Sequence, residues 1–358
     1  MEHLILVINP GGGSTKIGLF RGEELIKEEV ITHFPEEINK FDEIVEQLDF
    51  RKAAVIDFLK KNNIKLEELD AVVGRGGPFK PLRSGTYIVD QRMIDDVKNG
   101  NVLADHPSNL GCLLASDIAK LAGKKPAFIV DPVSVDEFIP ESRISGLPEI
   151  ERKSLAHTLN MKMVARKAAT ELSSKYNEIN LVIVHLGTGI SVGAYRKGEQ
   201  IDVNNANDGG PFSPQRAGSL PITQLAKLCY SEKYPDYKSM YKRLTKNGGV
   251  LAYLGTDKMS EVEKMIEKGD KYAELIYNAM IQQIAKEIGS MAAVLSGDVQ
   301  AIVITGGIAY LDKFVAKLKE KIKFITETIF VYPGEGELEA LARGALRVLK
   351  GEEDAKRY

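Results

Sequence analysis

The stretch INPGGGSTK, residues 8–16, follows directly on the apolar run LILV of residues 4–7. Three consecutive glycines weaken a helix or a strand interior by roughly 0.5–1 kcal/mol each, so they are expected where another group approaches the main chain closely. A strand, a glycine turn and a second strand expose several main-chain N–H groups on one side, where a phosphate group can bind if no Cβ blocks it. We therefore expect a phosphate-binding hairpin around Gly12, with Ser14 and Lys16 adding a hydroxyl donor and a cation.

This hairpin differs from the two common nucleotide-binding loops. A Walker A loop opens a helix with Gly-Lys-Ser/Thr, whereas Lys16 leads into the strand-like IGLF of residues 17–20. A dinucleotide fingerprint also needs a helix directly after its glycines. The pattern therefore favours a different phosphate-binding hairpin.

The same pattern returns at residues 181–195, LVIVHLGTGISVGAY. A β-rich run again meets a short glycine turn and a second strand that contains a glycine. Aligning Val7 with Val182 without a gap places Gly12 on Gly187. The likeness of the two hairpins indicates an internal repeat.

Two later strand ends support the repeat. AVVGRGG (71–77) and AIVITGGIA (301–309) are both apolar runs that stop at paired glycines. The chain is therefore expected to contain a duplicated domain, and two such hairpins facing one another across a cleft would hold one polyphosphate from both sides.

Helical patterns separate these strands. Apolar residues recur on one face from Asp270 to Leu295, and another helix is expected to follow a cap at Ser108. Alternating strands and helices predict an α/β fold with a mixed sheet in each half. Further helices are expected at residues 154–176, 260–269 and 338–351, the last crossing back to the first half.

Composition narrows the class of protein. The 358 residues are 44% apolar and 27% charged with a net charge of −2, so we expect about two globular domains and no broad basic face for nucleic acid. Cys112 and Cys229 lack metal-ligand spacing and fit a reducing cytoplasm. No segment reaches the roughly 20 apolar residues that span a bilayer, and the N-terminal apolar run lacks the features of a signal peptide. We expect a cytoplasmic protein without a membrane partner.

Seven segments carry a family resemblance in order along the chain. They are INPGGGSTK (8–16), DHPSNL (105–110), IVDP (129–132), RKSLAH (152–157), HLGTGIS (185–191), SPQRAG (213–218) and ITGGIA (304–309). Together they resemble the acetate/butyrate kinase family of the actin-like ATPase superfamily. The resemblance implies duplicated actin-like, ribonuclease H-like domains with mixed five-stranded sheets, flanking helices and a cleft between them. The first domain is expected at residues 1–148 plus 340–358, and the second, nucleotide-binding domain at residues 149–339.

The resemblance also implies an activity, the reversible transfer of the γ-phosphoryl group of ATP to a short-chain carboxylate. A carboxylate with a pKa of about 4–5 is already ionised at neutral pH, so no strong general base is needed. The site must instead supply positive charge and in-line positioning where two anions meet. Arg216, with its planar bidentate fork, is expected to stabilise the transferring group, and His157 to donate a hydrogen bond to it.

Metal and nucleotide residues follow from the same resemblance. Asp131 is expected to hold Mg²⁺ directly or through water, with Asp136 as a rival because the spacing to the next proline departs from the family's. Glu337 resembles a late glutamate near the metal, and Glu339 competes for that role. The expected ATP-binding residues are Asn9, Gly12, Ser14, Lys16, His185, Gly187, Thr188, Gly189, Gly306, Gly307 and Ile308.

Three departures from acetate kinases bear on the acid. Arg75 is the candidate for binding its carboxylate, although a strict register places Val72 there. Ala156 stands in place of an aromatic residue and Gly74 in place of a valine, and each added buried CH₂ in a larger acyl pocket is worth roughly 0.8 kcal/mol. The chain is also shorter than a typical acetate kinase. These departures favour butyrate or isobutyrate as the substrate.

Other functions stay open at this point. An acetate or propionate kinase is the nearest alternative, and a non-catalytic actin-like module, such as a chaperone or filament ATPase, belongs to a different class. A sugar kinase would need an aspartate base beside a hydroxyl-rich loop, which is not apparent in the sequence. The family also implies a homodimer or a larger homo-oligomer.

Overall fold

The structure, a computed structural model, describes residues 2–358, which form two compact units. Unit 1 comprises Met1–Asp136, Thr158–Asn160 and Gly336–Tyr358, and unit 2 comprises Glu137–His157 and Met161–Glu335. The chain enters unit 2 at Glu137, whereas the sequence placed that boundary after residue 148. Among residues 2–358, no helix is both long and apolar enough to span a bilayer.

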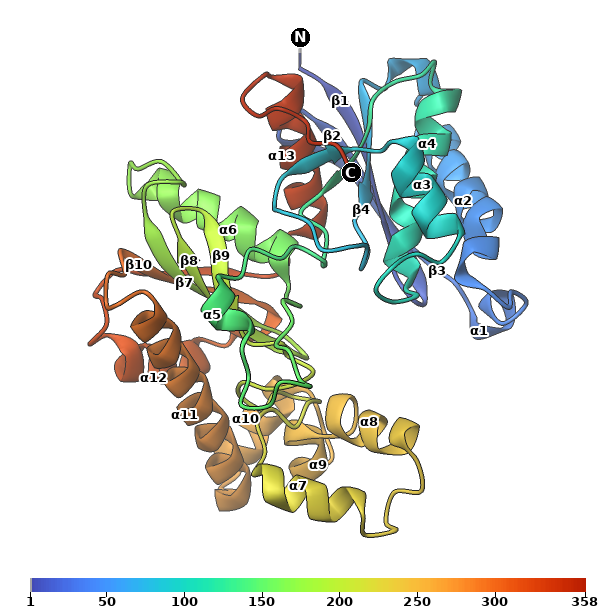
Figure 1. Ribbon diagram of the computed structural model, residues 1–358. Coiled ribbons are helices and arrows are strands. Elements are labelled where there is room, and N and C mark those ends of the chain that lie inside the picture. Colours follow the sequence, from blue (N-terminus) through green and yellow to red (C-terminus); the bar gives the residue numbers. More distant parts are fainter. Residues whose placement is uncertain (1) are drawn as a thin grey trace. The chain divides into compact units, whose positions relative to one another are not determined.

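Unit 1 is a mixed sheet with helices on both faces. Its elements are β1 (Leu4–Pro10), β2 (Ser14–Arg21), β3 (Glu24–Thr32), α1 (Pro35–Ile38), α2 (Leu48–Lys61), β4 (Ala71–Arg75), β5 (Thr86–Ile88), α3 (Gln91–Lys98), α4 (Leu110–Leu121), β6 (Ala127–Val130) and α13 (Glu337–Leu349). The strand order is β3-β2-β1-β4-β6-β5. Helices α2 to α4 cover one face, and α13, from the other end of the chain, covers the opposite face (Figure 1).

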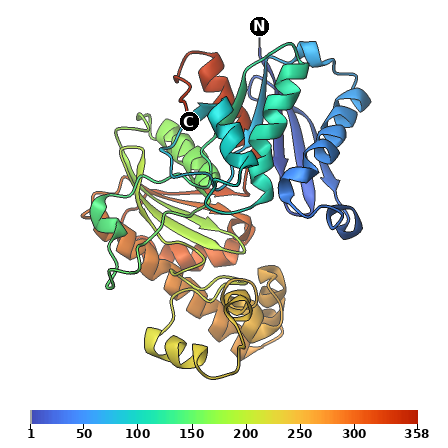
Figure 2. The same ribbon diagram turned by 45° about the vertical axis from the view of Figure 1, so that its right-hand side comes forward.

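Unit 2 repeats this plan and adds helices. Its elements are α5 (Pro140–Arg143), α6 (Thr158–Glu171), which starts in unit 1, β7 (Asn180–Leu186), β8 (Ile190–Arg196), β9 (Glu199–Val203), α7 (Ile222–Cys229), α8 (Tyr237–Thr245), α9 (Gly249–Leu254), α10 (Met259–Glu267), α11 (Lys271–Val294), β10 (Ala301–Gly306), α12 (Asp312–Ile322) and β11 (Ile329–Pro333). The strand order is β11-β10-β7-β8-β9. The yellow helices α7 to α9 lie outside the sheet layers in both views (Figures 1 and 2).

The two sheets confirm the duplicated α/β fold. In unit 1, β1 pairs antiparallel with β2 and parallel with β4, and β4 continues parallel to β6. In unit 2, β7 pairs antiparallel with β8 and parallel with β10, and β10 pairs parallel with β11. Strand β9 pairs antiparallel with β8 and corresponds to β3 of unit 1. The sheet of unit 1 adds a sixth, three-residue strand, β5, which runs antiparallel to β6 at the edge. A strand this short has no separate apolar pattern, so the sequence did not indicate it.

The structure corrects the alignment of the two hairpins. Gly18 lies opposite Val7, whereas Gly193 lies opposite Ile183. Val7 therefore corresponds to Ile183 rather than to Val182. The reason is that the turn between the paired residues Pro10 and Thr15 is one residue longer than the turn between Leu186 and Ile190, so a gapless alignment shifts the preceding strand.

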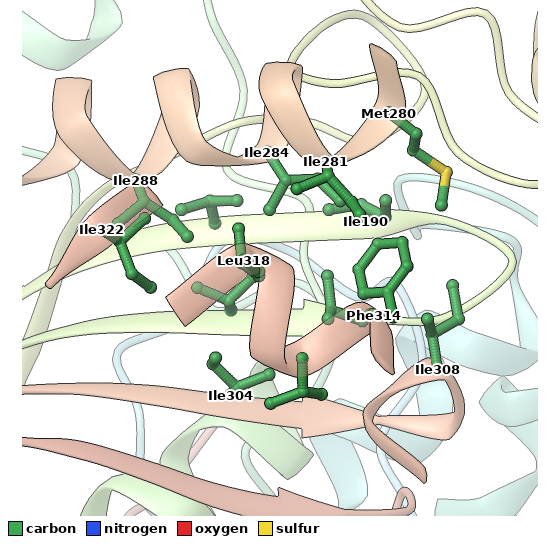
Figure 3. Close-up of a cluster of buried hydrophobic side chains, with 14 of the residues drawn as sticks. Ile190, Met280, Ile281, Ile284, Ile288, Ile304, Ile308, Phe314, Leu318 and Ile322 are labelled. Carbon is green, nitrogen blue, oxygen red and sulfur yellow. The ribbon is translucent and has the colours of Figure 1, made fainter. Parts of the chain in front are cut away.

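The core of unit 2 explains why its strands are apolar throughout. Alternate strand residues point to opposite faces, so Val182, Val184 and their neighbours pack against α11 and α12, whereas Leu181 and Ile183 pack against α6. Figure 3 shows the first of these layers, with Ile281 and Ile284 of α11 lying over the strand residue Ile190 and with Ile288 beside Ile322 of α12. Both faces are buried, which gives runs without polar alternation.

Local helix signals were partly correct. Asp270 caps α11 by accepting hydrogen bonds from the main-chain N–H groups of Tyr272 and Ala273. The expected cap at Ser108 is wrong, because Ser108 lies inside a 3₁₀ turn, Pro107–Asn109, and α4 begins at Leu110. The helix expected from residue 154 begins only at Thr158. Helices α7 to α9 were not anticipated.

Candidate active site

The first glycine turn of unit 1 presents main-chain N–H groups. Gly12 and Gly13 are exposed, and their N–H groups donate to no acceptor in residues 2–358. The carbonyl oxygens of Gly12 and Gly13 accept hydrogen bonds from the Arg51 side chain and the His33 N–H. A trans peptide points its N–H away from its C=O, so the N–H groups of Gly13 and Ser14 face the opposite side. This arrangement is typical of an anion-binding turn.

A polar cluster lies beside this turn at the strand ends. Asn9 lies opposite Lys16 in the hairpin, and Asn9 Nδ2 donates to Glu337 Oε2 over 2.6 Å. Arg75, the last residue of β4, donates from Nη1 to Glu337 Oε1. The Arg75 side chain is 12% exposed, and its buried Nε has no acceptor in the described part of the chain. Arg75 is therefore fixed in place by Glu337, and its buried Nε donor is unused among these residues.

Electrostatics keep Glu337 ionised. Burial raises the pKa of this carboxyl group, but Arg75, Asn9 and Lys16 together outweigh burial and hold the pKa below its usual value. Both carboxylate oxygens are engaged, one by Arg75 and one by Asn9. In this state Glu337 anchors Arg75.

The structure distinguishes Glu337 from Glu339 and Arg75 from Val72, the two pairs between which the sequence left a choice. Glu339 forms a surface pair with Arg343 on the same helix, so Glu337 is the glutamate that joins the cluster. Val72 is fully buried within β4, so only Arg75 can offer a cation there. Both distinctions depend on which face of an element a residue occupies.

His106, in the segment DHPSNL, completes this part of unit 1. Its Nδ1 accepts a hydrogen bond from the Ser108 N–H and lies 2.7 Å from Ser108 Oγ. Burial, followed by the charge of Arg75, lowers the pKa of His106, against an opposing contribution from Asp105. A neutral imidazole beside Arg75 leaves that guanidinium as the local cation.

Asp131 occupies a strained position at the carboxyl end of β6. It is 2% exposed and has a φ of +37°, which a non-glycine residue rarely adopts. Its Oδ1 accepts a hydrogen bond of 2.7 Å from the Gly85 N–H. Strain of this kind gathers at functional sites. Asp136 is half-buried and donates its main-chain N–H to the Leu82 carbonyl.

The carboxylates present suit Mg²⁺ better than a metal that needs several side-chain ligands. Residues 2–358 contain no group of three His, Cys, Asp or Glu side chains arranged to hold a metal ion. Mg²⁺ keeps several waters and is usually held by one or two carboxylates together with substrate phosphates. Asp131 could serve as such a carboxylate, and Glu337, with one hydrogen bond to each oxygen from the described residues, keeps a lone pair on each.

The second glycine turn, in unit 2, is supported by a serine and an arginine. The Gly187 N–H donates to the Gly189 carbonyl, and Ser213 Oγ donates to the Thr188 carbonyl over 2.5 Å. The Arg216 guanidinium lies so close to Gly189 that a Cβ there would meet its atoms at 2.5–2.9 Å. Glycine at this position lets the cation of Arg216 lie directly against the turn.

Main-chain bonds hold the segment that carries Arg216. The Ser213 N–H donates to the Arg216 carbonyl, and the Arg216 N–H donates to Ser213 Oγ, which closes a tight turn. The N–H groups of Gly248 and Val250 donate to the carbonyls of Gln215 and Ser213. Burial lowers the pKa of Arg216, and Tyr241 acts in the opposite direction. Arginine remains a cation under such a change, so the turn carries fixed positive charge.

Two histidines stack beside the same turn. The rings of His157 and His185 lie with centroids 3.9 Å apart and planes inclined by 8°. His157 Nδ1 lies 3.0 Å from Ser191 Oγ, and Ser191 lies opposite His185 in the β7–β8 ladder. His185 is 1% exposed. The stack and the Ser191 contact orient the His157 ring.

The paired glycines after β10 differ in what they do. Gly306 has a φ of +92°, and a Cβ there would collide with the main chain of Leu186. A Cβ at Gly307 would meet nothing within 4 Å, so this residue leaves an open approach. The side chain of Ile308 packs into the core beside Phe314 (Figure 3), which leaves only its main chain for a nucleotide.

The acyl-pocket interpretation of Gly74 is wrong. A Cβ on Gly74 would overlap the carbonyl group of Gly111 in α4. Gly74 therefore allows close packing of a helix against β4 and opens no space for a substrate. Ala156 is 9% exposed and belongs to the core cluster with Phe138 and Met161, so its small size is also used in packing.

Gly74→Ala is expected to lower the free energy of unfolding by about 3 kcal/mol, because the methyl group has no space beside Gly111. Urea unfolding would measure the change. Gly146→Ala is the control, since a Cβ at Gly146 meets nothing within 4 Å. Equal stability of the two variants would show that Gly74 borders open space after all.

Sequence reasoning missed Arg51, although a signal was present. Arg51 shares a face of α2 with the buried residues Val55, Phe58 and Leu59. A cation on the apolar face of a helix is unusual and could have been singled out from the helical period alone. Its partners are in the first glycine turn, which no local pattern of α2 reveals.

Residues 149–325 match the acetokinase family. This acetokinase-like stretch contains His157, His185, Thr188 and Arg216. The motifs of the second half of the chain therefore coincide with the region that the family model covers.

Solved structures agree on the fold. The acetate kinase of Porphyromonas gingivalis is similar with a TM-score of 0.79 and 20% identity, over 97% of this chain and 100% of that one. A propionate kinase from Francisella tularensis subsp. tularensis SCHU S4 has a TM-score of 0.73 and 19% identity, over 95% of this chain and 98% of that one. The acetate kinase of Entamoeba histolytica has a TM-score of 0.74 and 17% identity, over 95% of this chain and 98% of that one. The chain thus has the acetate kinase type of actin-like fold.

Proposed function

We propose that this protein is a carboxylate kinase, which transfers the γ-phosphoryl group of ATP to a short-chain carboxylic acid and also catalyses the reverse reaction. The observation that carries the proposal is the state of Arg75, an anchored and mostly buried guanidinium whose Nε donor is unused among the described residues, beside a glycine turn. A guanidinium is suited to a carboxylate because it is planar and always charged. The acetokinase match over residues 149–325 supports the same class of reaction.

The proposed roles follow from what each group can donate. Arg75 binds the carboxylate of the acid, Glu337 holds Arg75 in place, and Asn9 holds Glu337. The turn at Gly12 and Gly13 and the turn at Gly187–Gly189 donate main-chain N–H groups to the phosphates of ATP, and Gly307 lies on the adenosine side.

Residues of unit 2 are proposed to stabilise the negative charge of the transferring phosphoryl group. Arg216 stabilises the equatorial oxygens of the transferring group, as expected for an electrostatic mechanism, and His157 donates a hydrogen bond to it. Asp131 would hold Mg²⁺, which supplies neutralisation of phosphate charge when bound. The acid arrives already ionised, so none of these residues has to act as a strong base.

We propose butyrate or isobutyrate as the preferred acid. Support comes from the shorter chain, whereas Gly74 and Ala156 are both used in packing and no longer contribute. Acetate and propionate kinases share this fold, so chain length is the property to measure.

The reaction class is tested by trapping the product. Purified protein with ATP, Mg²⁺ and butyrate is expected to form an acyl phosphate that hydroxylamine converts to a hydroxamate. A non-catalytic actin-like module would give no hydroxamate, and a sugar kinase would consume ATP with a hexose instead.

Acid preference is tested in one steady-state assay across acids of two to five carbons. We expect kcat/KM to be higher for butyrate or isobutyrate than for acetate, because each buried CH₂ adds roughly 0.8 kcal/mol of binding. A higher kcat/KM for acetate would instead identify an acetate kinase and leave the reaction class intact.

A further inference from the structure

Arg51 is a buried cation that has no counterion among the described residues. It is 0% exposed and lies on α2 beneath the first glycine turn. Nε and Nη2 donate to Gln47 Oε1, Nη1 donates to the Ser14 carbonyl and to Thr15 Oγ1, and Nη2 also donates to the Gly12 carbonyl. All five N–H groups therefore have acceptors, and every acceptor is neutral. Within residues 2–358 no carboxylate pairs with Arg51.

The surroundings do not neutralise this charge. Burial lowers the pKa of Arg51 to about 10, so the group is still protonated at neutral pH. His33 is a titratable neighbour of this cluster, and its Nε2 lies 2.8 Å from Thr15 Oγ1, which accepts from Arg51. Burial, and then the charge of Arg51, lower the pKa of His33 against an opposing contribution from Glu37, so Arg51 is the charged member of this pair.

An uncompensated buried charge is costly to the free protein, so a partner for it is expected elsewhere. Arg51 holds the carbonyls of Gly12 and Ser14 on its own side of the turn. The bond to the Gly12 carbonyl turns the N–H group of Gly13 outward, and a positive charge behind the turn adds to the attraction of this group for an anion. Low dielectric surroundings strengthen this attraction.

We infer that Arg51 is a positioning residue for phosphate, whose charge acts through the first glycine turn and is balanced only when the phosphate chain of the nucleotide binds there. The inference rests on the proposed function for the assignment of ATP as the ligand. It adds a source of charge that does not touch the ligand. The other turn differs, since Arg216 lies directly against Gly189.

Gln47→Glu provides a sharp test, because Gln47 Oε1 already accepts from both Nε and Nη2 of Arg51. The variant places a carboxylate on the guanidinium without changing size. We expect the affinity for ATP, measured by calorimetric titration, to fall roughly tenfold, as for loss of one charge-assisted interaction. The urea midpoint is expected to equal or exceed that of the wild type, because the buried charge is now paired.

Lys52→Met is the matched control. It changes the net charge by the same amount and lies next to Arg51, but Lys52 is already paired with Asp49 and Asp117. ATP affinity of this variant is expected to stay within about twofold of the wild type, since a paired surface charge contributes little. Arg51→Lys is expected to retain more ATP affinity than Arg51→Gln, although both lose hydrogen bonds to the turn.

The outcomes separate this inference from the proposed function. A Gln47→Glu protein that binds ATP as tightly as the wild type, or that unfolds at lower urea concentration, would overturn the role of Arg51. Equal ATP affinities of Arg51→Lys and Arg51→Gln would also overturn it, because hydrogen bonding alone would then explain the residue. A wild-type protein that binds ATP and tripolyphosphate but phosphorylates no acid would refute the proposed function and leave the inference standing.

Discussion

Arg216→Ala is expected to lower kcat by about 10³-fold while the protein stays folded. An arginine that stabilises a transferring phosphoryl group commonly contributes a factor of this order. The fold should persist because the segment around Arg216 is held by main-chain bonds from Gly248 and Val250, which the substitution leaves in place. Rates are measured as hydroxamate formation at saturating ATP and acid, and folding by urea unfolding.

Two further variants sharpen this test. Arg243→Ala removes an arginine of α8 in the same unit, and it is expected to leave kcat unchanged. Gly189→Ala places a methyl group where the Arg216 guanidinium lies, so it should lose activity without loss of the arginine itself. Near-normal turnover of Arg216→Ala would remove this residue from the mechanism.

Arg75→Met is expected to raise the KM for the acid about 100-fold with little change in the KM for ATP. Truncating one partner of a buried charge pair generally costs this much affinity. Because the substitution also leaves Glu337 partly buried without its cation, the free energy of unfolding should fall by roughly 1–3 kcal/mol. Steady-state kinetics with each substrate varied in turn would measure the first effect.

The double variant Arg75→Met/Glu337→Gln separates binding from stability. The amide oxygen introduced at position 337 would still accept the hydrogen bond that Asn9 now gives to Glu337, and no unpaired carboxylate remains there. Stability is expected to return toward that of the wild type, whereas the KM for the acid stays high. Recovery of both properties together would show that Arg75 serves the fold alone and does not bind the substrate.

Much of the fold could be read from short-range patterns. Apolar runs ended by glycines indicated β1, β7 and β10 because these strands are buried on both faces. Their repetition predicted the duplication, which the identical order of the five shared strands confirms. The one-residue error in aligning the hairpins arose because turn length is set by main-chain pairing rather than by residue type.

Some candidate site residues could be proposed from the sequence, whereas others were identified only by the tertiary structure. Glycines and strand-end polar residues such as Asn9 and His185 could be proposed from sequence, since the carboxyl end of a strand decides where they lie. The choice of Glu337 over Glu339 and of Arg75 over Val72 needed the tertiary structure, because each depends on a partner from a distant part of the chain. The packing role of Gly74 likewise depends on Gly111 in α4.

The sequence by itself therefore determined the repeated α/β architecture and the two glycine turns, because hydrophobic period and glycine punctuation act over a few neighbouring residues. Only the tertiary structure decided which charges surround those turns. The helical period places Arg51 on the apolar face of α2, but only folding brings it against Gly12, Ser14 and Thr15. The partners of a buried charge come from segments far apart in sequence, so no local pattern can specify them.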